Sequence, residues 1–322
     1  MKLNMVEAIN LALKQEMKKD GNVIVLGEDV GVDGGVFRVT EGLLKLYGEK
    51  RVLDTPLAES GIIGTSIGMA AYGLKPVAEV QFSGFMYPGF DQLISHASRI
   101  RNRSRGMFSC PMVVRAPYSG GIRALEHHSE SMEAIYVHTP GLKVVIPSRP
   151  YDAKGLLISS IRDPDPVIFL EPKRVYRAIK EEVPEEEYTL PLGKCNVVKE
   201  GNEITVVSYG AMMKLVLEAV EKLENVSAEV IDVRTLSPLD DETIINSVKK
   251  TGRCVIVHEA PRSCGFAAEI IARINEKALL SLEAPVKRIT GYDTVIPLAK
   301  LENEYLPSVK RIMHGIEEVL SF

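Results

Sequence analysis

The chain has 322 residues, 45% of them hydrophobic, and a formal net charge of −4 at pH 7. This is enough apolar material for a large core, and the length favours two domains. The acidic balance argues against nucleic acid or an anionic membrane as a partner. The four cysteines form no CxxC pair, so we expect neither a zinc site nor a disulfide framework. No apolar run could cross a bilayer and no signal or transit segment is seen, so we expect a cytoplasmic protein, with a mature organellar chain as the alternative.

The N-terminal region alternates between helix and strand patterns. Asn4 can cap a helix, and Glu7 is placed to complete a capping box. A short apolar strand over residues 22–26 is followed by a loop that contains Glu28, Asp29 and a glycine-rich run over residues 31–35. In open α/β sheets, the loops at the carboxyl ends of the strands are where ligands gather.

The stretch over residues 54–68 combines a strand end, a proline-stiffened turn and a helix start. Glu59 lies at the start of this helix, beside backbone N–H groups that favour a carboxylate. Gly61, Gly64 and Gly68 follow at helical spacing and lower helix stability. We interpret Glu59 as a proton-handling carboxylate and the glycine face as the surface on which a partner chain packs. The alternatives are a simple helix-start charge and tight internal packing.

The rest of the first half continues the alternation. Strands are predicted over residues 75–82, 112–115, 142–146 and 167–170, with an aromatic loop over residues 83–90 and helices over residues 91–105 and 151–161. The helix over residues 91–105 carries four arginines that could contact phosphate or RNA. We prefer a solvent-facing or subunit-facing helix, because no aromatic residues are interleaved with the arginines.

The second half repeats the pattern after a polar, proline-broken run that is typical of a linker. Strands are predicted over residues 204–208, 230–233, 254–258 and 286–289, and helices over residues 213–223, 240–249 and 266–277. This rhythm predicts an α/β protein of two domains, each a mostly parallel sheet flanked by helices. We place the domains at residues 1–180 and 194–322, with a linker over residues 181–193.

Common nucleotide-binding and hydrolase motifs are absent from the sequence: there is no nucleophile elbow, no GxxxxGK[ST] loop and no GxGxxG after a strand. The remaining candidates are Glu59, the aromatic loop after Gln81, and the pair His127 and His128, which lies in a loop approached through two glycines. His258 closes a strand and is interpreted as structural or as part of a domain seam.

Several ordered segments carry a family resemblance: GEDVG (27–31), DTPLAESGIIG (54–64), YPGFDQ (87–92), HHS (127–129), PGLKVVIPS (140–148), DAKGLL (152–157) and VIDVRTLSPLD (230–240). Over nearly its full length, the chain resembles the beta subunit of the thiamine-diphosphate-dependent decarboxylase of 2-oxoacid dehydrogenase complexes. Three further segments resemble the branched-chain 2-oxoacid type: EPKRVYRA (171–178), HEAPRSCGFAAEI (258–270) and GYDTVIP (291–297). The pyruvate and acetoin types are the alternatives.

The resemblance implies a pyrimidine-binding, transketolase-like domain followed by a transketolase C-terminal-type domain. It places Glu59 against a ring nitrogen of the cofactor's aminopyrimidine, where a shared proton stabilises the imino tautomer. Gln81 and Phe85 would line the pyrimidine end of the cofactor site. His128 would stand near the substrate carboxylate or the incoming lipoyl group and assist acyl transfer as an acid–base, with His127 as the register alternative.

The resemblance also implies ions and partners. A structural potassium would be held by the backbone carbonyls of Cys110, Met112, Val113, Ser160, Asp163 and Asp165. The family's GDG motif with its later asparagine pair is absent, so an alpha subunit is expected to supply the magnesium and diphosphate half of the site in an α2β2 heterotetramer.

The implied reaction is oxidative decarboxylation of branched-chain 2-oxo acids, with reductive acylation of the lipoyl group of an acyltransferase core. We expect the C-terminal domain to dock this core. A distant alternative is a non-enzymatic α/β protein that binds nucleotides or RNA.

Overall fold

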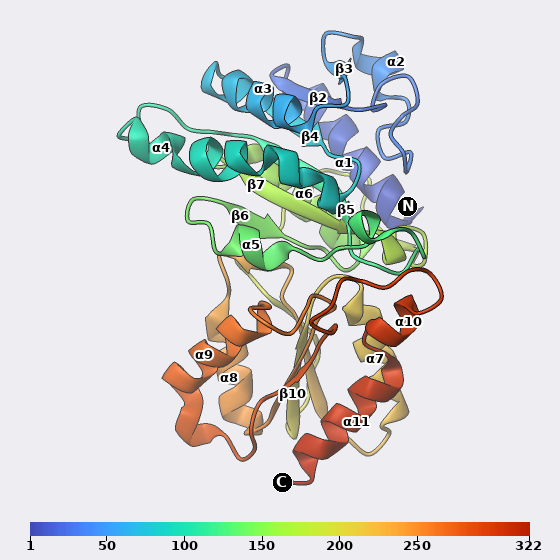
Figure 1. Cartoon of the computed structure of the whole chain (residues 1–322), viewed down its shortest axis with the longest axis vertical. Helices are drawn as coiled ribbons and strands as arrows, with labels where there is room; N and C mark the ends of the chain where they lie inside the picture. Colours follow the sequence, from blue (N-terminus) through green and yellow to red (C-terminus); the bar gives the residue numbers. More distant parts are fainter.

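The computed structural model describes residues 1–322 and contains two large sheets, one in each half of the chain (Figure 1). Strands of the first half are β2 (Val23–Gly27), β3 (Val52–Asp54), β4 (Lys75–Glu79), β5 (Val113–Tyr118), β6 (Lys143–Val145) and β7 (Val167–Pro172). With β12 (Thr235–Ser237), they form a seven-stranded sheet in the order β12-β6-β7-β5-β4-β2-β3. Every pairing in this sheet is parallel except that of β12 with β6.

Helices cover the first sheet on both faces. They are α1 (Met5–Lys19), α2 (Leu43–Tyr47), α3 (Glu59–Ala71), α4 (Ile100–Arg103), α5 (Glu133–Val137) and α6 (Pro150–Arg162). The capping box predicted at α1 is confirmed, because the Asn4 side chain accepts from the Glu7 amide at 3.0 Å and the Glu7 carboxylate accepts from the Asn4 amide at 2.8 Å.

The helix predicted over residues 91–105 is wrong as a single element. The structure has a π-helical turn η2 (Gln92–His96), a 3₁₀ turn η3 (Ala97–Arg99) and the short α4. The Ser98 hydroxyl bonds back to the Ile94 carbonyl at 2.7 Å, which competes with regular helix geometry. The backbone of Gly141 packs directly on the Ser98 carbonyl, where a Cβ atom would overlap it. The aromatic loop is also more regular than predicted, since it forms the 3₁₀ helix η1 (Ser83–Gly89).

The second half is built around a five-stranded sheet that contains the four predicted strands. Its strands are β9 (Asn196–Lys199), β10 (Ile204–Ser208), β11 (Ala228–Asp232), β13 (Cys254–Val257) and β14 (Lys287–Ile289), in the order β14-β13-β10-β11-β9, and only β9 is antiparallel to its neighbour. The helices are α7 (Met212–Lys222), α8 (Asp241–Thr251), α9 (Ala267–Ala278), α10 (Glu302–Tyr305) and α11 (Val309–Leu320). Of these elements, β9, α10 and α11 were not predicted. Figure 1 shows α8 and α9 on one side of the sheet and α7 and α11 on the other.

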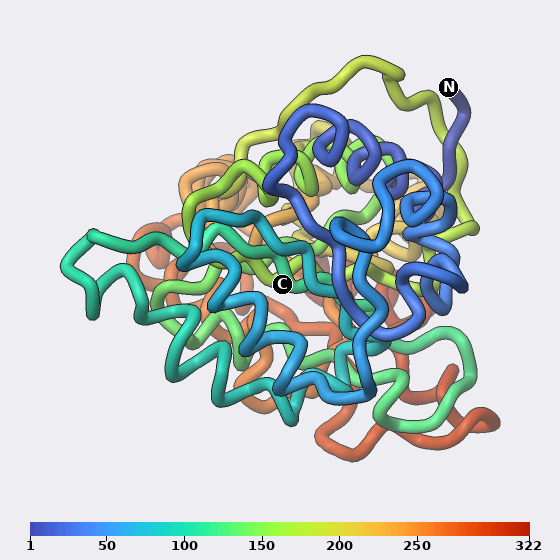
Figure 2. The backbone as a smooth tube through the Cα atoms, turned by 90° about the horizontal axis from the view of Figure 1, so that it is seen from above, coloured from blue at the N-terminus to red at the C-terminus, as the bar shows by residue number.

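The two halves are joined by more than the chain between them. Strand β8 (Glu181–Glu182) pairs with β1 (Lys2–Leu3), so the polar run returns to the N-terminus, as Figure 2 shows. The Lys154 ammonium donates to the carbonyls of Pro184 and Glu186 at 2.5 and 2.8 Å. Both large clusters of buried apolar side chains draw residues from both halves. The predicted linker is therefore packed against the first half.

A buried triad of charges lies across the centre of the first sheet. The Arg115 guanidinium on β5 donates two hydrogen bonds of 2.7 Å to the Glu171 carboxylate on β7 and pairs with Glu79 on β4. The Tyr176 hydroxyl donates to Glu171 at 2.5 Å. Arg115 and Glu171 are fully buried, and burial raises the pKa of Glu79. Removing Arg115 would leave two buried carboxylates, Glu79 and Glu171, without their cation.

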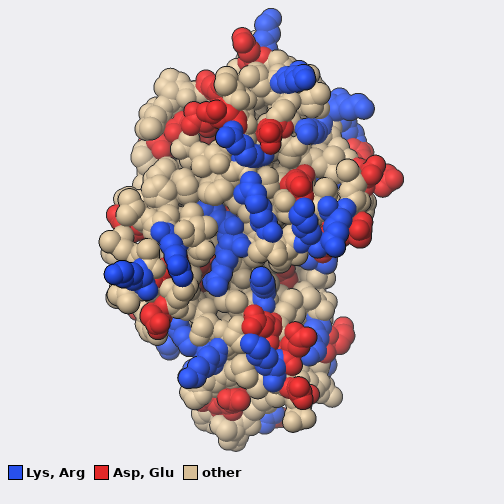
Figure 3. All heavy atoms as spheres, turned by 90° about the vertical axis from the view of Figure 1, so that its right-hand side faces the viewer, with Lys and Arg blue, Asp and Glu red and all other residues tan.

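On the face drawn in Figure 3, Lys and Arg are mixed with Asp and Glu, and the basic side chains gather over the middle of the molecule. None of the helices combines the length and the hydropathy that crossing a bilayer requires.

Candidate cofactor and acid–base site

Glu59 is the first residue of α3. The preceding residue, Ala58, makes no side-chain capping bond to the helix, so the first-turn N–H groups favour a carboxylate at this point. Glu59 is half-buried at the surface of the chain and is not enclosed in the apolar interior. Its position leaves it accessible to a bound group or to a neighbouring chain.

A second carboxylate, that of Glu28, lies near Glu59. Burial raises the pKa of Glu28, and the negative charge of Glu59 raises it further. The loop that carries Glu28 is held by Asp54 at the end of β3, whose carboxylate accepts from the Gly31 amide at 2.6 Å. Because β2 and β3 are parallel neighbours, the two carboxylates meet at the carboxyl edge of the sheet, where ligands were expected.

Segment η1 connects the start of α3 with the histidine loop. A Cβ atom at Gly89 would overlap Ile63 and lie 3.3 Å from the Glu59 carbonyl oxygen. A Cβ atom at Gly84 would overlap the His127 carbonyl. Glycine at both positions therefore allows η1 to lie directly against both elements, which brings Glu59 and the two histidines to the same region of the molecule.

His128 packs against two aromatic rings. Its ring centroid lies 4.4 Å from that of Phe82 and 5.0 Å from that of Phe85, both in edge-to-face geometry. His128 Nδ1 is buried and has no hydrogen-bond partner within the chain. His127 instead exposes 56% of its side chain, with Nδ1 3.5 Å from a carboxylate oxygen of Glu130. Of the two histidines, only His128 is held against the aromatic cluster.

Gln81 lies at the same sheet edge as Glu28. Its amide donates to the Asp29 carboxylate at 2.9 Å. Sequence reasoning missed Phe82, which contacts Phe85 and His128 and packs on Phe37 at 5.6 Å between ring centroids. The only available signal was its place at the end of an apolar strand, which gives no indication of its partners.

The three glycines on α3 have free space around them in this chain. A Cβ atom at Gly68 would meet nothing within 4 Å, and one at Gly64 or Gly61 would make only ordinary contacts of 3.7 and 3.6 Å. Gly61 and Gly68 are exposed. Tight packing inside the chain therefore does not account for these glycines.

The segments predicted to bind potassium converge at one end of the first sheet. The Cys110 amide donates to the Pro164 carbonyl at 3.1 Å, and the Val167 amide donates to the Met112 carbonyl at 3.0 Å. Ser160 and Asp163 are joined by a 3.3 Å backbone bond. A carbonyl oxygen has a second lone pair, so these bonds leave room for an ion. No cluster of three or more His, Cys, Asp or Glu side chains is arranged to hold a metal.

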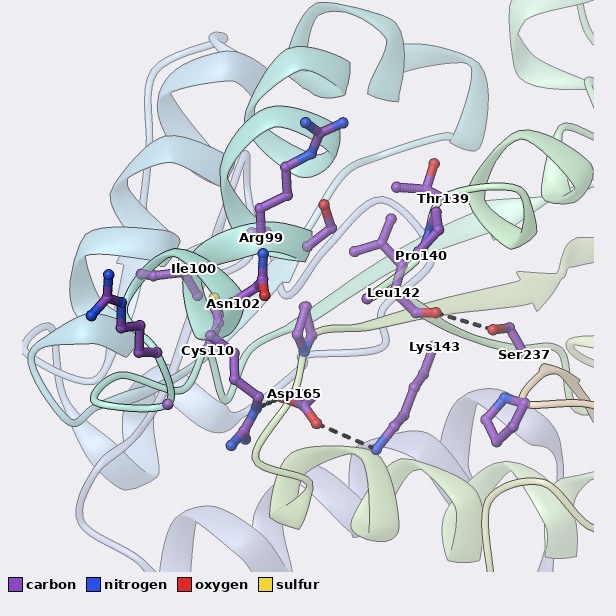
Figure 4. Close-up of a pocket in the computed structure, with 18 residues that line it drawn as sticks. Arg99, Ile100, Asn102, Cys110, Thr139, Pro140, Leu142, Lys143, Asp165 and Ser237 are labelled. Atoms are coloured by element: carbon purple, nitrogen blue, oxygen red, sulfur yellow. Dashed lines mark hydrogen bonds and ion pairs between the residues drawn. The ribbon is translucent and has the colours of Figure 1, made fainter.

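A cavity of about 910 Å³ lies beside these segments, and Cys110 and Asp165 are among its lining residues (Figure 4). Lys143 points toward Asp165, with Nζ 3.9 Å from the carboxylate, and also contacts Asp163 at 2.6 Å. Arg101 pairs with Asp165 at 2.5 Å. None of the predicted cofactor-binding or catalytic residues lines this cavity.

His258 is buried at the end of β13, and neither ring nitrogen has a hydrogen-bond partner. Its ring stacks on Tyr209 with 6.1 Å between centroids. Burial lowers the pKa of His258 to about 4. Below the ordinary histidine pKa the unfolded chain takes up a proton that the folded chain resists, so stability is present above pH 6.5 and is lost as the pH falls toward 4.

The variant His258→Asn should therefore lose part of the acid destabilisation of the chain. Between pH 7 and pH 4, the unmodified chain should lose about 3 kcal/mol more of its free energy of unfolding than the variant, as the size of the pKa shift indicates. Urea unfolding of the isolated chain at several pH values measures it. The control is His314→Asn, which removes an exposed imidazole from α11. If both variants change the pH dependence of the free energy of unfolding equally, burial of His258 is not the cause of the acid destabilisation.

Two family models cover most of the chain: the transketolase pyrimidine-binding domain matches residues 1–179, and the transketolase C-terminal domain matches residues 193–312. A pyruvate dehydrogenase E1 component subunit beta of Acholeplasma laidlawii is 57% identical over 319 residues, covering 98% of each chain. One from Staphylococcus aureus is 53% identical over 322 residues, covering 99% of each.

Among solved structures, a split-gene transketolase described as an inactive β4 tetramer aligns with a TM-score of 0.82 over 100% of this chain and 99% of its own, at 20% identity. This likeness supports the two-domain fold. The domain matches and the two relatives show that the chain belongs to the beta subunits of thiamine-diphosphate-dependent 2-oxoacid dehydrogenases.

Proposed function

We propose that this chain is the beta subunit of a pyruvate dehydrogenase decarboxylase component. With an alpha subunit, it would catalyse oxidative decarboxylation of pyruvate and transfer of the acetyl group to a lipoyl group. The observation that carries the proposal is the 57% identity, over 98% of both chains, to a protein of that name. The branched-chain interpretation depended on three short segments, and the relatives favour its pyruvate alternative instead.

The proposal assigns proton handling to Glu59. Thiamine diphosphate, when bound, supplies the nucleophilic carbon and the electron sink for decarboxylation. Glu59 would share a proton with the ring nitrogen of the aminopyrimidine, because its place at the start of α3 leaves the side chain half-buried and within reach of a bound group. Gln81 and Phe85 would line the pyrimidine end. Two observations support the fit of these residues to the cofactor: Gln81 lies at the same sheet edge as Glu28 and Glu59, and His128 Nδ1 is buried without a hydrogen-bond partner.

His128 would serve acyl transfer as an acid–base. Phe82 and Phe85 pack on its ring from two directions, which limits its rotation and excludes water from that side. The imidazole ring has one nitrogen that can accept a proton and one that can donate it, which suits proton transfer during acylation. The exposed His127 would remain at the entrance to the site.

The proposed complex is an α2β2 heterotetramer in which the alpha subunit supplies the magnesium and diphosphate half of the cofactor site. The exposed face of Gly61, Gly64 and Gly68, which no contact within the chain explains, would be the place where another subunit's helix approaches closely. The acyl group would pass to a lipoyl arm on an acyltransferase core that the C-terminal domain docks.

Co-expression with an alpha chain that carries the GDG motif and the asparagine pair tests the function. Turnover with an artificial electron acceptor is measured on pyruvate, on 3-methyl-2-oxobutanoate and on acetoin. The proposal expects pyruvate to be the preferred substrate. Preference for 3-methyl-2-oxobutanoate would restore the branched-chain interpretation, and no turnover on any of the three would contradict the enzymatic role.

We also propose that a structural potassium ion is bound by the converging segments at Cys110, Met112, Val113, Ser160, Asp163 and Asp165. Replacing sodium by potassium at constant ionic strength should then raise the melting temperature of the assembled complex by several degrees, by binding linkage. Identical melting curves in the two salts would contradict the site.

A further inference from the structure

The loop that leads from β5 to the histidines has an unusual backbone. Ser119, Gly121 and Arg123 have φ values of 76°, 94° and 58°, in the left-handed region. Because every second residue of this loop is in the left-handed region, the loop backbone makes few hydrogen bonds with itself. Its buried amides therefore need hydrogen-bond partners from elsewhere. The 3₁₀ turn η4 (Glu126–His128) follows directly, so the position of His128 depends on how this loop is held.

The hydrogen-bond acceptors for these loop amides come from the C-terminal half of the chain. The Glu302 carboxylate on α10 accepts from the Gly121 amide at 2.7 Å and from the Arg123 amide at 3.0 Å, one bond to each oxygen. Glu259, after β13, accepts from the Gly120 amide at 3.1 Å. Figures 1 and 2 both place the α10 segment beside this loop. Glu302 is 2% exposed, so its bonds are largely shielded from water.

One buried lysine, Lys173, also holds this loop. The buried Lys173 ammonium donates to the Ser119 carbonyl. Burial lowers the pKa of Lys173 to about 7, against the opposing effect of Glu259 and Glu302. Glu302 has no ion pair within 4.0 Å, so its two bonds to the loop are its main close polar contacts.

The glycine pair Gly120 and Gly121 suits this close approach of the loop to Glu302 and Arg174. A Cβ atom at Gly120 would lie 3.1 Å from Glu302 Oε1, and one at Gly121 would lie 2.7 Å from Arg174 Cδ. A side chain at Gly120 would crowd the Glu302 carboxylate, and one at Gly121 would crowd Arg174 and would have to adopt a φ of 94°, which favours glycine.

We infer that Glu302 is a positioning residue for His128: from the C-terminal half, it fixes the loop that carries this histidine, so acyl transfer depends on the seam between the two halves. This inference rests on the proposed function of His128. Glu302 itself touches neither His128 nor the aromatic cluster in the structure, and it would act only through the loop backbone.

The test uses Glu302→Gln, with Glu304→Gln as the matched control on the same short helix, where the side chain is exposed. Glutamine keeps the side-chain volume but can accept from only one of the two amides and turns an NH₂ group toward the other. In the full chain, hydrogen exchange at the Gly121 and Arg123 amides should become about tenfold faster, from the loss of one charged hydrogen bond. Glu304→Gln should leave exchange unchanged.

The second readout separates the two half-reactions in the assembled complex. Decarboxylation measured with an artificial electron acceptor should stay within about twofold of the unmodified complex, while reductive acylation of a lipoyl domain should fall about tenfold, by the same loss of one bond. A purely structural defect would lower both half-reactions together.

Unchanged hydrogen-exchange rates at the Gly121 and Arg123 amides in Glu302→Gln would overturn the inference. It would also be overturned if the rates of the two half-reactions fell equally or did not fall. An unmodified complex without turnover on any substrate would contradict the proposed function, and the exchange result would still decide whether Glu302 holds the loop. If Glu302→Gln does not fold, Glu302→Asp, which keeps the charge and shortens the side chain by one carbon, gives the same two readouts.

Discussion

The Glu59→Gln complex should assemble with its alpha subunit and lose about 10²–10⁴-fold in decarboxylation rate, the range typical of a lost general acid–base. Glutamine matches the shape of glutamate but cannot exchange a proton with the aminopyrimidine. Because Glu59 is half-buried at a helix start, the substitution should change folding little. Size-exclusion chromatography measures assembly, and pre-steady-state decarboxylation measures the rate.

The control for this prediction is Glu242→Gln. Glu242 lies in the first turn of α8 and is exposed, so this substitution removes a comparable helix-start charge away from the site. It should lower stability by about 0.3–1 kcal/mol through the helix dipole and leave turnover unchanged. Full activity of the Glu59→Gln complex would contradict the proton role, and a failure to assemble would instead point to an interface role.

The second large effect is expected in the buried triad of the first sheet. Arg115→Met should destabilise the chain by about 3–5 kcal/mol, because Glu79 and Glu171 would remain buried without their cation. Urea unfolding at neutral pH measures the loss. The control is Arg101→Met, which removes a partly exposed partner of Asp165 and should cost at most about 1 kcal/mol.

The pH dependence of the Arg115→Met variant provides a further check. Burial raises the pKa of Glu79 even with the arginine present. An acid whose folded pKa lies above its unfolded value destabilises the fold as the pH rises through that range, so the deficit of Arg115→Met should shrink as the pH is lowered toward 5. A deficit below 1 kcal/mol, or one that grows on acidification, would contradict this account of the triad.

Sequence reasoning located most of the regular elements because their signals are local. Asn4 and Glu7, three positions apart, predict the start of α1, and the apolar runs at β2 and β10 mark fully buried parallel strands. Placing Glu59 at the start of α3 required only the turn before it and the helix after it. The same local signals failed over residues 91–105, where Ser98 and the packed Gly141 interrupt the helix.

The sequence by itself determined the α/β class, the alternation of strands and helices, the capping of α1 and the place of Glu59 at a helix start, since each depends on residues a few positions apart. Only the tertiary structure decided that β12 joins the first sheet, that Arg115 is shared between two glutamates, and that His128 packs on Phe82 and Phe85. The same holds for the bond from Gly121 to Glu302, 181 residues away. Such contacts depend on which distant segments fold side by side, and no local pattern of hydrophobicity or turn residues encodes that choice.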